Sequence, residues 1–145
     1  MKFSHEVVIN KSREDVWRLF DNPDNLKKWQ PALKSFEHQS GRPGQAGAAS
    51  KLIYEENGRE IVLIETIESR NYPEEFSGSY SSSHATNHLT NRFIALDDRA
   101  TKWAVDCEFV FHVFFLKLFG PLMKGMFVKR VTGDMNRFKE FAEGQ

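Results

Sequence analysis

Two asparagines, Asn87 and Asn91, are the polar residues whose positions bear most directly on ligand binding. They alternate with Leu89 and Phe93, so all four side chains share one face of a predicted strand. If that face points inward, each buried carboxamide needs hydrogen-bond partners or costs about 1–3 kcal/mol. The asparagines therefore either bind a polar group of a ligand or internal water, or lie near strand ends and bond backbone or solvent.

Four further residues are candidate acids, bases or ligand anchors. His5 is either a general base or ligand donor, or a satisfied histidine beside the core. Tyr54 and Tyr80 are either core aromatics with a hydroxyl partner or ligand anchors. Glu65 either faces inward with Leu63 or is a solvated carboxylate, because its strand is apolar on both faces. The sequence contains no recognisable acid–base pair.

The sequence predicts neither a metal site nor a cofactor. His84 and His88 have a spacing that chelates metals on a helix, but they fall on a turn and a strand. Four strand residues span about 13 Å, which separates the two imidazoles. Cys107 is the only cysteine, which excludes an intramolecular disulfide and a paired-cysteine zinc site. It is expected to be an inert buried thiol.

The chain that must position these residues consists mainly of strands. Alternating or β-branched stretches predict strands at 3–9, 32–39, 47–56, 60–68, 75–82, 85–96 and 101–112. Ser12 predicts the N-cap of a short helix, and a second short helix begins at Pro23 and ends at Trp29. Asn57-Gly58 is typical of a hairpin turn.

The last 25 residues have a helical period instead. After Gly120-Pro121, one apolar stripe is formed by Met123, Phe127, Val131, Met135, Phe138 and Ala142. Only this long helix is large enough to cover the inner face of the strands. The sequence therefore predicts one α+β domain over residues 1–145, with about seven antiparallel strands curved around a C-terminal helix.

Composition limits the classes of function. The 20 basic and 20 acidic residues give a net charge of zero, which argues against nucleic-acid binding. No apolar run is typical of a signal peptide or a membrane-spanning helix, which predicts a soluble, cytoplasmic protein. The 13 phenylalanines among 145 residues either pack a bulky core or line an apolar cavity.

Several stretches resemble the Bet v 1-like superfamily, also called START-like or SRPBCC, which includes polyketide cyclase/dehydratase and lipid-transport members. The stretches are Val16–Phe20, Asn25–Pro31, Thr101–Trp103 and Phe138–Phe141. The resemblance covers nearly the whole chain and implies a helix-grip fold. It also implies a deep, mostly apolar cavity for a hydrophobic small molecule between sheet and helix. It implies no catalytic residue, because the superfamily has no shared catalytic set.

Strand parity and the helix stripe select the residues expected to contact a ligand there. They are His5, Val7, Leu52, Tyr54, Phe76, Tyr80, Asn87, Leu89, Asn91, Phe93, Val105, Cys107, Phe109, Met123, Phe127 and Val131. On the last strand, Asp106 and Glu108 alternate with these apolar residues, so the apolar face is expected to point inward. The inward face of residues 60–68 stays undecided.

Residues 113–127 form the most apolar stretch, and 113–132 contains four basic residues and no acid. Three interpretations remain open. The stretch packs on the core as a junction with snorkelling lysines. Alternatively, it forms a cavity mouth that contacts membranes or an anionic partner, or it forms a homodimer interface.

Three functions are compatible with this sequence. The first is binding of a hydrophobic small molecule such as a lipid or polyketide. The second is a cyclase or dehydratase, a lyase or isomerase in which His5, Glu65 or a tyrosine acts as acid or base. The third is a protein-interaction module, for which a collapsed cavity and an exposed patch near 113–127 are expected.

Overall fold

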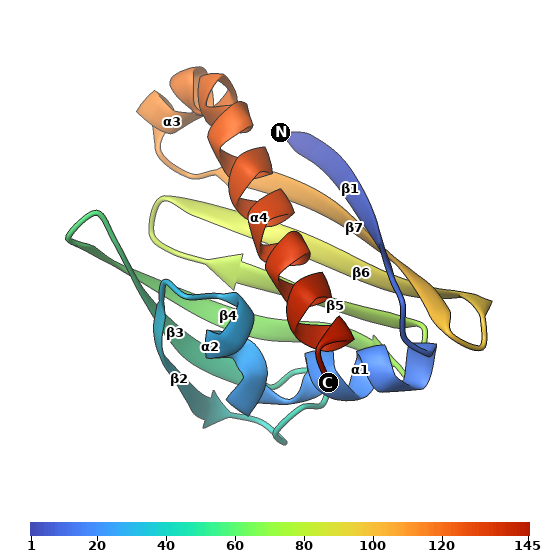
Figure 1. Ribbon diagram of the computed structural model, residues 1–145. Coiled ribbons are helices and arrows are strands. Elements are labelled where there is room, and N and C mark those ends of the chain that lie inside the picture. Colours follow the sequence, from blue (N-terminus) through green and yellow to red (C-terminus); the bar gives the residue numbers. More distant parts are fainter.

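The computed structural model describes residues 1–145 and shows a curved antiparallel sheet with one long helix across its concave face (Figure 1). The strands are β1 (Lys2–Ile9), β2 (Leu33–Ser40), β3 (Ala49–Glu56), β4 (Arg59–Asn71), β5 (Glu75–Ser81), β6 (Ala85–Asp97) and β7 (Ala100–Phe111). Their order is β1-β7-β6-β5-β4-β3-β2, so β2 to β7 form a meander and β1 adds to the β7 edge. The predicted helix-grip fold is confirmed.

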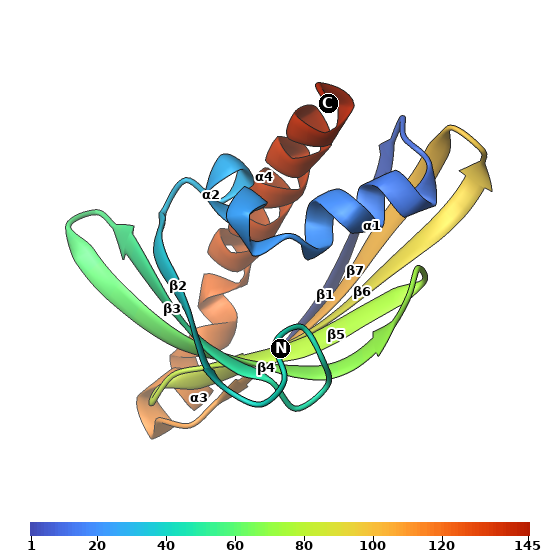
Figure 2. The ribbon, with the colours of Figure 1, turned by 90° about the horizontal axis from the view of Figure 1, so that it is seen from below.

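The helices lie at the two ends of the sheet and across it. They are α1 (Arg13–Asp21), η1 (Pro23–Asn25), α2 (Leu26–Trp29), α3 (Phe114–Phe119), η2 (Gly120–Met123) and α4 (Lys124–Glu143). Figure 2 shows α4 running over the hollow of the sheet, with α1 and α2 beside its C-terminal half. No helix is long and apolar enough to cross a membrane.

Local sequence signals explain two of the boundaries. The Ser12 hydroxyl accepts a hydrogen bond from the Asp15 amide at 3.2 Å, so Ser12 caps α1 as expected. Asn57 and Gly58 both have positive φ, at 51° and 74°. A two-residue hairpin loop with this backbone matches the twist of its strands and connects β3 to β4.

Seven aromatic residues pack at the end of the hollow that α1 and α2 close. We call Trp17, Phe20, Trp29, Phe76, Phe93, Trp103 and Phe138 the aromatic cluster. The Phe20 ring lies at its centre, 5.1–5.9 Å from five other rings of the cluster. Most pairs meet edge to face, an arrangement that aromatic quadrupoles favour. This end of the hollow is therefore filled.

The C-terminal helical segment begins earlier than the sequence predicts. Helix α3 starts at Phe114, six residues before the expected start at Gly120. A run that is apolar on every side has no amphipathic period, so the pattern could not distinguish this helix from an irregular junction. Most of its side chains are exposed, which contradicts the interpretation that this stretch packs on the core.

Candidate functional site

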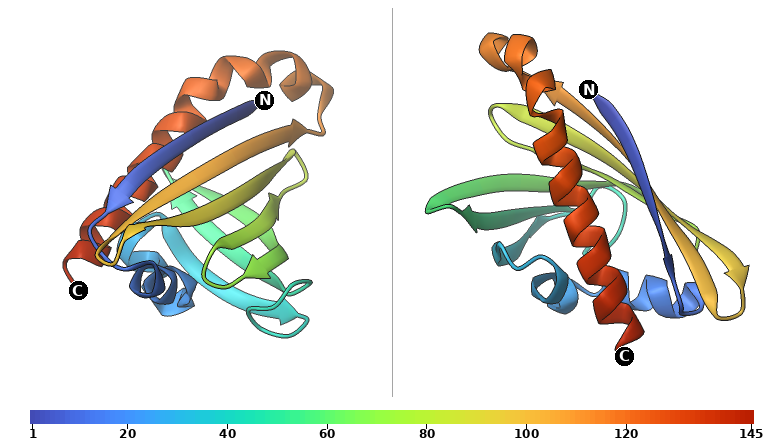
Figure 3. Two further views of the ribbon diagram at one scale, coloured as in Figure 1. Left: turned by 90° about the vertical axis from the view of Figure 1, so that its right-hand side faces the viewer. Right: turned by 45° about the horizontal axis from the view of Figure 1, so that its top comes forward.

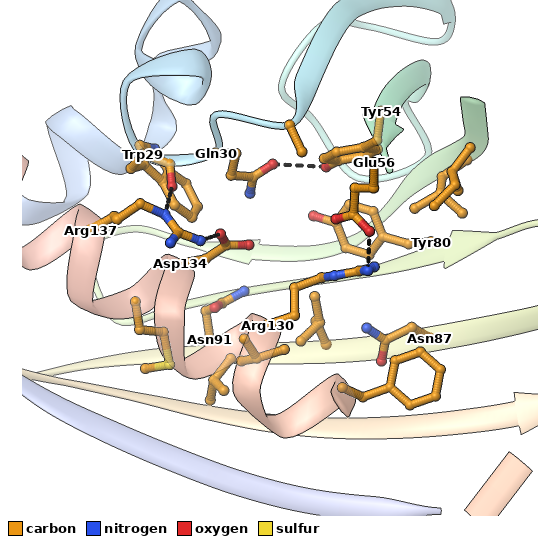
Figure 4. A pocket seen from close by; sticks show the side chains of 18 of the residues that line it. Trp29, Gln30, Tyr54, Glu56, Tyr80, Asn87, Asn91, Arg130, Asp134 and Arg137 are labelled. Atoms are coloured by element: carbon orange, nitrogen blue, oxygen red, sulfur yellow. Dashed lines mark hydrogen bonds and ion pairs between the residues drawn. The ribbon is translucent and has the colours of Figure 1, made fainter. Parts of the chain in front are cut away.

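A cavity of about 360 Å³ lies between the sheet and α4 (Figure 4). Its walls come from β3 to β7, from residues 127–137 of α4 and from the residues after α2. The residues shared with the aromatic cluster, Phe20, Trp29 and Trp103, bound it on one side. Of the 24 lining residues 15 are hydrophobic, and the volume falls in the range of small-molecule sites.

Nine of the predicted site residues line this cavity: Tyr54, Tyr80, Asn87, Leu89, Asn91, Val105, Phe109, Phe127 and Val131. Strand parity brings them together because alternate residues of β6 and β7 face inward and α4 covers them. Strand β4 also turns its odd-numbered side chains inward, among them Ile61 and Leu63, whereas Val62 and Ile64 are exposed. Ligand contact by these residues stays a prediction.

Seven predicted residues do not line the cavity: His5, Val7, Leu52, Phe76, Phe93, Cys107 and Met123. His5 and Val7 face inward on β1, but this strand lies at the far edge beside β7, where α4 covers it. Phe76 and Phe93 belong to the aromatic cluster. The alternation of residues predicts which face of the sheet a side chain lies on. It does not predict how far along the hollow that side chain lies.

The remaining three residues differ in their burial. Leu52 and Cys107 are each 2% exposed and lie away from the cavity surface, whereas Met123 is exposed. Burial raises the pKa of the Cys107 thiol to about 12, and neighbouring Asp106 adds to the shift. The thiol therefore stays protonated at neutral pH, as expected for an inert buried cysteine.

The two asparagines differ in how their hydrogen bonds are satisfied. Asn91 donates from Nδ2 to the Phe76 carbonyl at 3.2 Å and accepts from Trp103 Nε1 at 3.0 Å. Its role is structural, since both ends of the amide have protein partners. The Asn87 Oδ1 atom is buried without a partner in a cavity-lining residue. It is therefore an acceptor that no protein donor satisfies, in a residue that lines the cavity.

The cavity also has a polar side that sequence analysis missed (Figure 4). Arg130 pairs with Glu56, and Arg137 pairs with Asp134 and donates to the Trp29 carbonyl at 3.1 Å. The sequence contains a pattern that could have indicated this polar side. Arg130 and Asp134 are three or four residues from Phe127 and Val131, so they lie next to the apolar stripe on the same face of the helix.

Pairing leaves the polar side without a free charge. Each arginine in the wall has a carboxylate partner, and the Tyr54 hydroxyl donates to Gln30 Oε1 at 2.8 Å. Burial raises the pKa values of Tyr54 and Tyr80, so both hydroxyls stay protonated. Burial also raises the pKa of Asp134, against the opposing effect of Arg137. The site therefore favours an uncharged guest.

Glu65 faces inward opposite Tyr80 in the β4–β5 pairing, which excludes the solvated-carboxylate interpretation. Burial raises its pKa, and interaction with Tyr80 opposes the shift. A carboxyl with a raised folded-state pKa stabilises the fold below its unfolded pKa, and this contribution is lost as pH rises through the folded value.

Glu65→Gln is therefore expected to remove the loss of stability that ionisation of the Glu65 carboxyl causes as pH rises. Relative to the unmodified protein, the variant should gain free energy of unfolding as pH rises from about 4 to 7. Urea denaturation across this range measures the difference. Glu60→Gln, at an exposed position on the same strand, is the control. A constant difference between Glu65→Gln and the parent would contradict the prediction.

Comparison with known proteins defines the class to which this fold and cavity belong. A family model described as "Polyketide cyclase / dehydrase and lipid transport" matches residues 1–143. The chain belongs to this family, as the sequence resemblance implied. No curated protein sequence matches the chain significantly.

Solved structures confirm the fold at low sequence identity. The Zhui aromatase/cyclase from Streptomyces sp. R1128 superposes with a TM-score of 0.83 at 12% identity, covering 99% of this chain and 93% of that one. A START superfamily protein from Mycobacterium smegmatis gives 0.73 at 15%, covering 97% and 98%. Norcoclaurine synthase from Thalictrum flavum, in complex with dopamine and hydroxybenzaldehyde, gives 0.70 at 12%, covering 97% and 85%.

Proposed function

We propose that this protein binds an uncharged, mostly apolar small molecule that carries at least one hydroxyl group. The observation that carries the proposal is the cavity with the buried, unpartnered Asn87 Oδ1 in its wall. An apolar body would contact Leu89, Val105 and Phe109, while a hydroxyl would donate to Asn87. Charged guests are disfavoured because the arginines of the wall are already paired.

The related structures support this chemistry. The norcoclaurine synthase structure holds dopamine, a cationic amine, and hydroxybenzaldehyde, which is uncharged; both are small aromatic molecules with hydroxyl groups, and it is this hydroxylated aromatic part that supports the proposal. Members of this fold thus accommodate such compounds. The interaction-module alternative receives less support, because it requires a collapsed cavity and the cavity here is open.

Ligand capture can be tested by native mass spectrometry of the purified protein, followed by solvent extraction of any bound compound. A panel of hydroxylated aromatic and polyketide-like compounds then provides candidates for titration. Leu89→Trp should fill the cavity and abolish binding. Asn87→Leu should weaken a hydroxylated ligand by about 10-fold or more and spare its deoxy analogue.

The control for the larger side chain is Ile94→Trp, on the same strand with its side chain exposed on the outer face. It should bind like the unmodified protein. Failure of every compound to bind, or equal binding by Leu89→Trp and Ile94→Trp, would reject the proposal.

A second candidate function is cyclase or dehydratase chemistry, which the Tyr80 hydroxyl and the Asp134 carboxyl in the wall favour. The Tyr80 hydroxyl stays protonated and could donate a hydrogen bond to a reacting oxygen, while the Asp134 carboxylate, paired with Arg137, could accept a proton as a general base. The same mass-spectrometric experiment distinguishes the two functions. A bound compound recovered unchanged indicates binding alone, whereas a product that has lost one water, absent with Asp134→Asn, indicates catalysis.

A further inference from the structure

The corner between β7 and α4 exposes many apolar side chains. We call it the corner patch, formed by Phe114, Phe115, Leu118, Phe119, Leu122, Met123 and Met126. Phe114 is 80% exposed and Leu122 is 81% exposed. Single exposed apolar residues are ordinary on protein surfaces, but seven within one helical corner mark a surface that is covered in use.

The charges around the corner patch are all of one sign. Lys117, Lys124 and Lys129 lie in or beside it, none of them has a salt bridge, and residues 113–132 contain no carboxylate. The fourth basic residue, Arg130, is paired with Glu56. The patch therefore combines exposed phenylalanines, leucines and methionines with three unpaired ammonium groups on a protein whose formal net charge is zero.

The shape of the corner separates its candidate partners. α3 and the start of α4 project beyond the end of the sheet, at the opposite end of α4 from the C-terminus (Figure 3). A projecting tip can enter a deformable layer. A symmetric dimer through the same tip would bring two sets of unpaired lysines together, and like charges repel across an interface.

We propose that the corner patch docks on an anionic lipid bilayer. The apolar side chains enter the boundary between head groups and acyl chains, and the lysines contact lipid phosphates. Helical segments with an apolar surface and basic neighbours bind membranes in this manner. α3 and the first turns of α4 lie along the interface and do not cross the bilayer, in agreement with the absence of a helix that could span it.

The corner patch is joined to the cavity wall by stacked rings. The Phe127 ring, one turn after Met123, stacks on Phe109 at 4.5 Å, and Phe109 stacks on Phe111 at 6.3 Å. Gly120 packs directly on Phe111, where an added Cβ would lie 2.7 Å from the ring. Docking would therefore place one wall of the cavity next to the lipid. The proposal itself does not depend on what the cavity binds.

Vesicle flotation tests the proposal with the full chain. Vesicles of phosphatidylcholine with about one-third phosphatidylglycerol should carry the protein, and pure phosphatidylcholine vesicles should carry far less. Phe114→Ser combined with Leu122→Ser should reduce partitioning at least about 30-fold. Lys117→Gln combined with Lys124→Gln should reduce it about 10-fold and weaken its dependence on salt.

Matched controls are available elsewhere on the surface. Ile94→Ser with Leu96→Ser removes two exposed apolar groups from β6, and Lys27→Gln with Lys34→Gln removes two exposed charges. Both controls should float like the unmodified protein, and circular dichroism should show all variants folded. No flotation with anionic vesicles would overturn the proposal. So would sedimentation velocity showing a dimer that Phe114→Ser and Leu122→Ser dissociate, since the patch would then be a subunit interface.

Discussion

Phe138→Ala is expected to lower the free energy of unfolding by about 3–5 kcal/mol, the usual cost of deleting a buried aromatic ring. Phe138 is 0% exposed. Its ring lies 5.2 Å from Trp103 and 5.3 Å from Trp29, and it also contacts Phe20. The surrounding rings belong to the sheet, α1 and α2. They cannot fill the cavity that the substitution leaves unless these elements move relative to α4.

Urea denaturation at neutral pH measures this loss. Phe114→Ala is the matched control, because it deletes the same ring at a position that is 80% exposed. Its free energy of unfolding should change by no more than about 0.5 kcal/mol. Equal losses in the two variants would mean that α4 does not hold the aromatic cluster against the sheet.

The aromatic cluster explains how one small domain can have both a firm core and a cavity. The sequence left two uses open for its 13 phenylalanines, a bulky core or a cavity lining. The structure contains both. Large rings close one end of the hollow between α1, α2 and α4. Toward the other end, smaller side chains such as Leu89 and Val105 leave the cavity open.

Strand faces were predictable wherever polar and apolar residues alternate. On β7, Trp103, Val105 and Cys107 are buried while Glu108 is exposed, as parity predicted. Alternation requires only local sequence, because the pleat sends successive side chains to opposite faces. On β4 both faces carry apolar residues, so its inward side could be read only from its pairing with β3 and β5.

The polar side of the cavity could not be predicted from local pattern. Arg130 reaches Glu56 across 74 residues of sequence, and Arg137 reaches the Trp29 carbonyl across 108. Such pairs depend on the angle at which α4 crosses the sheet, which no short segment determines. His5 shows the converse. Its face was predicted, but the topology places β1 away from the cavity.

Phe109→Asp is expected to impair both stability and ligand binding. Phe109 lines the cavity and stacks between Phe111 and Phe127. Substitution removes these contacts and places a carboxylate among aromatic rings. Burial disfavours the charged form, so the new aspartate would have a raised pKa and a cost of at least about 3 kcal/mol at neutral pH. For a domain of this size, the melting temperature should fall by roughly 6–12 °C.

The effect should also depend on pH, because the cost of burying the carboxylate grows as it ionises. At pH 4 the buried aspartate of the folded form is protonated, and the unfolded form, with an aspartate pKa of about 3.9, is only about half ionised, so the deficit should be smaller there than at pH 7. Val110→Asp is the matched control, since the next residue on β7 is 42% exposed on the outer face. It should melt within about 2 °C of the parent and keep ligand binding. Similar melting temperatures of the two variants would mean that the inward face of β7 is wrongly assigned. The residues of β7 would then not form a wall of the cavity.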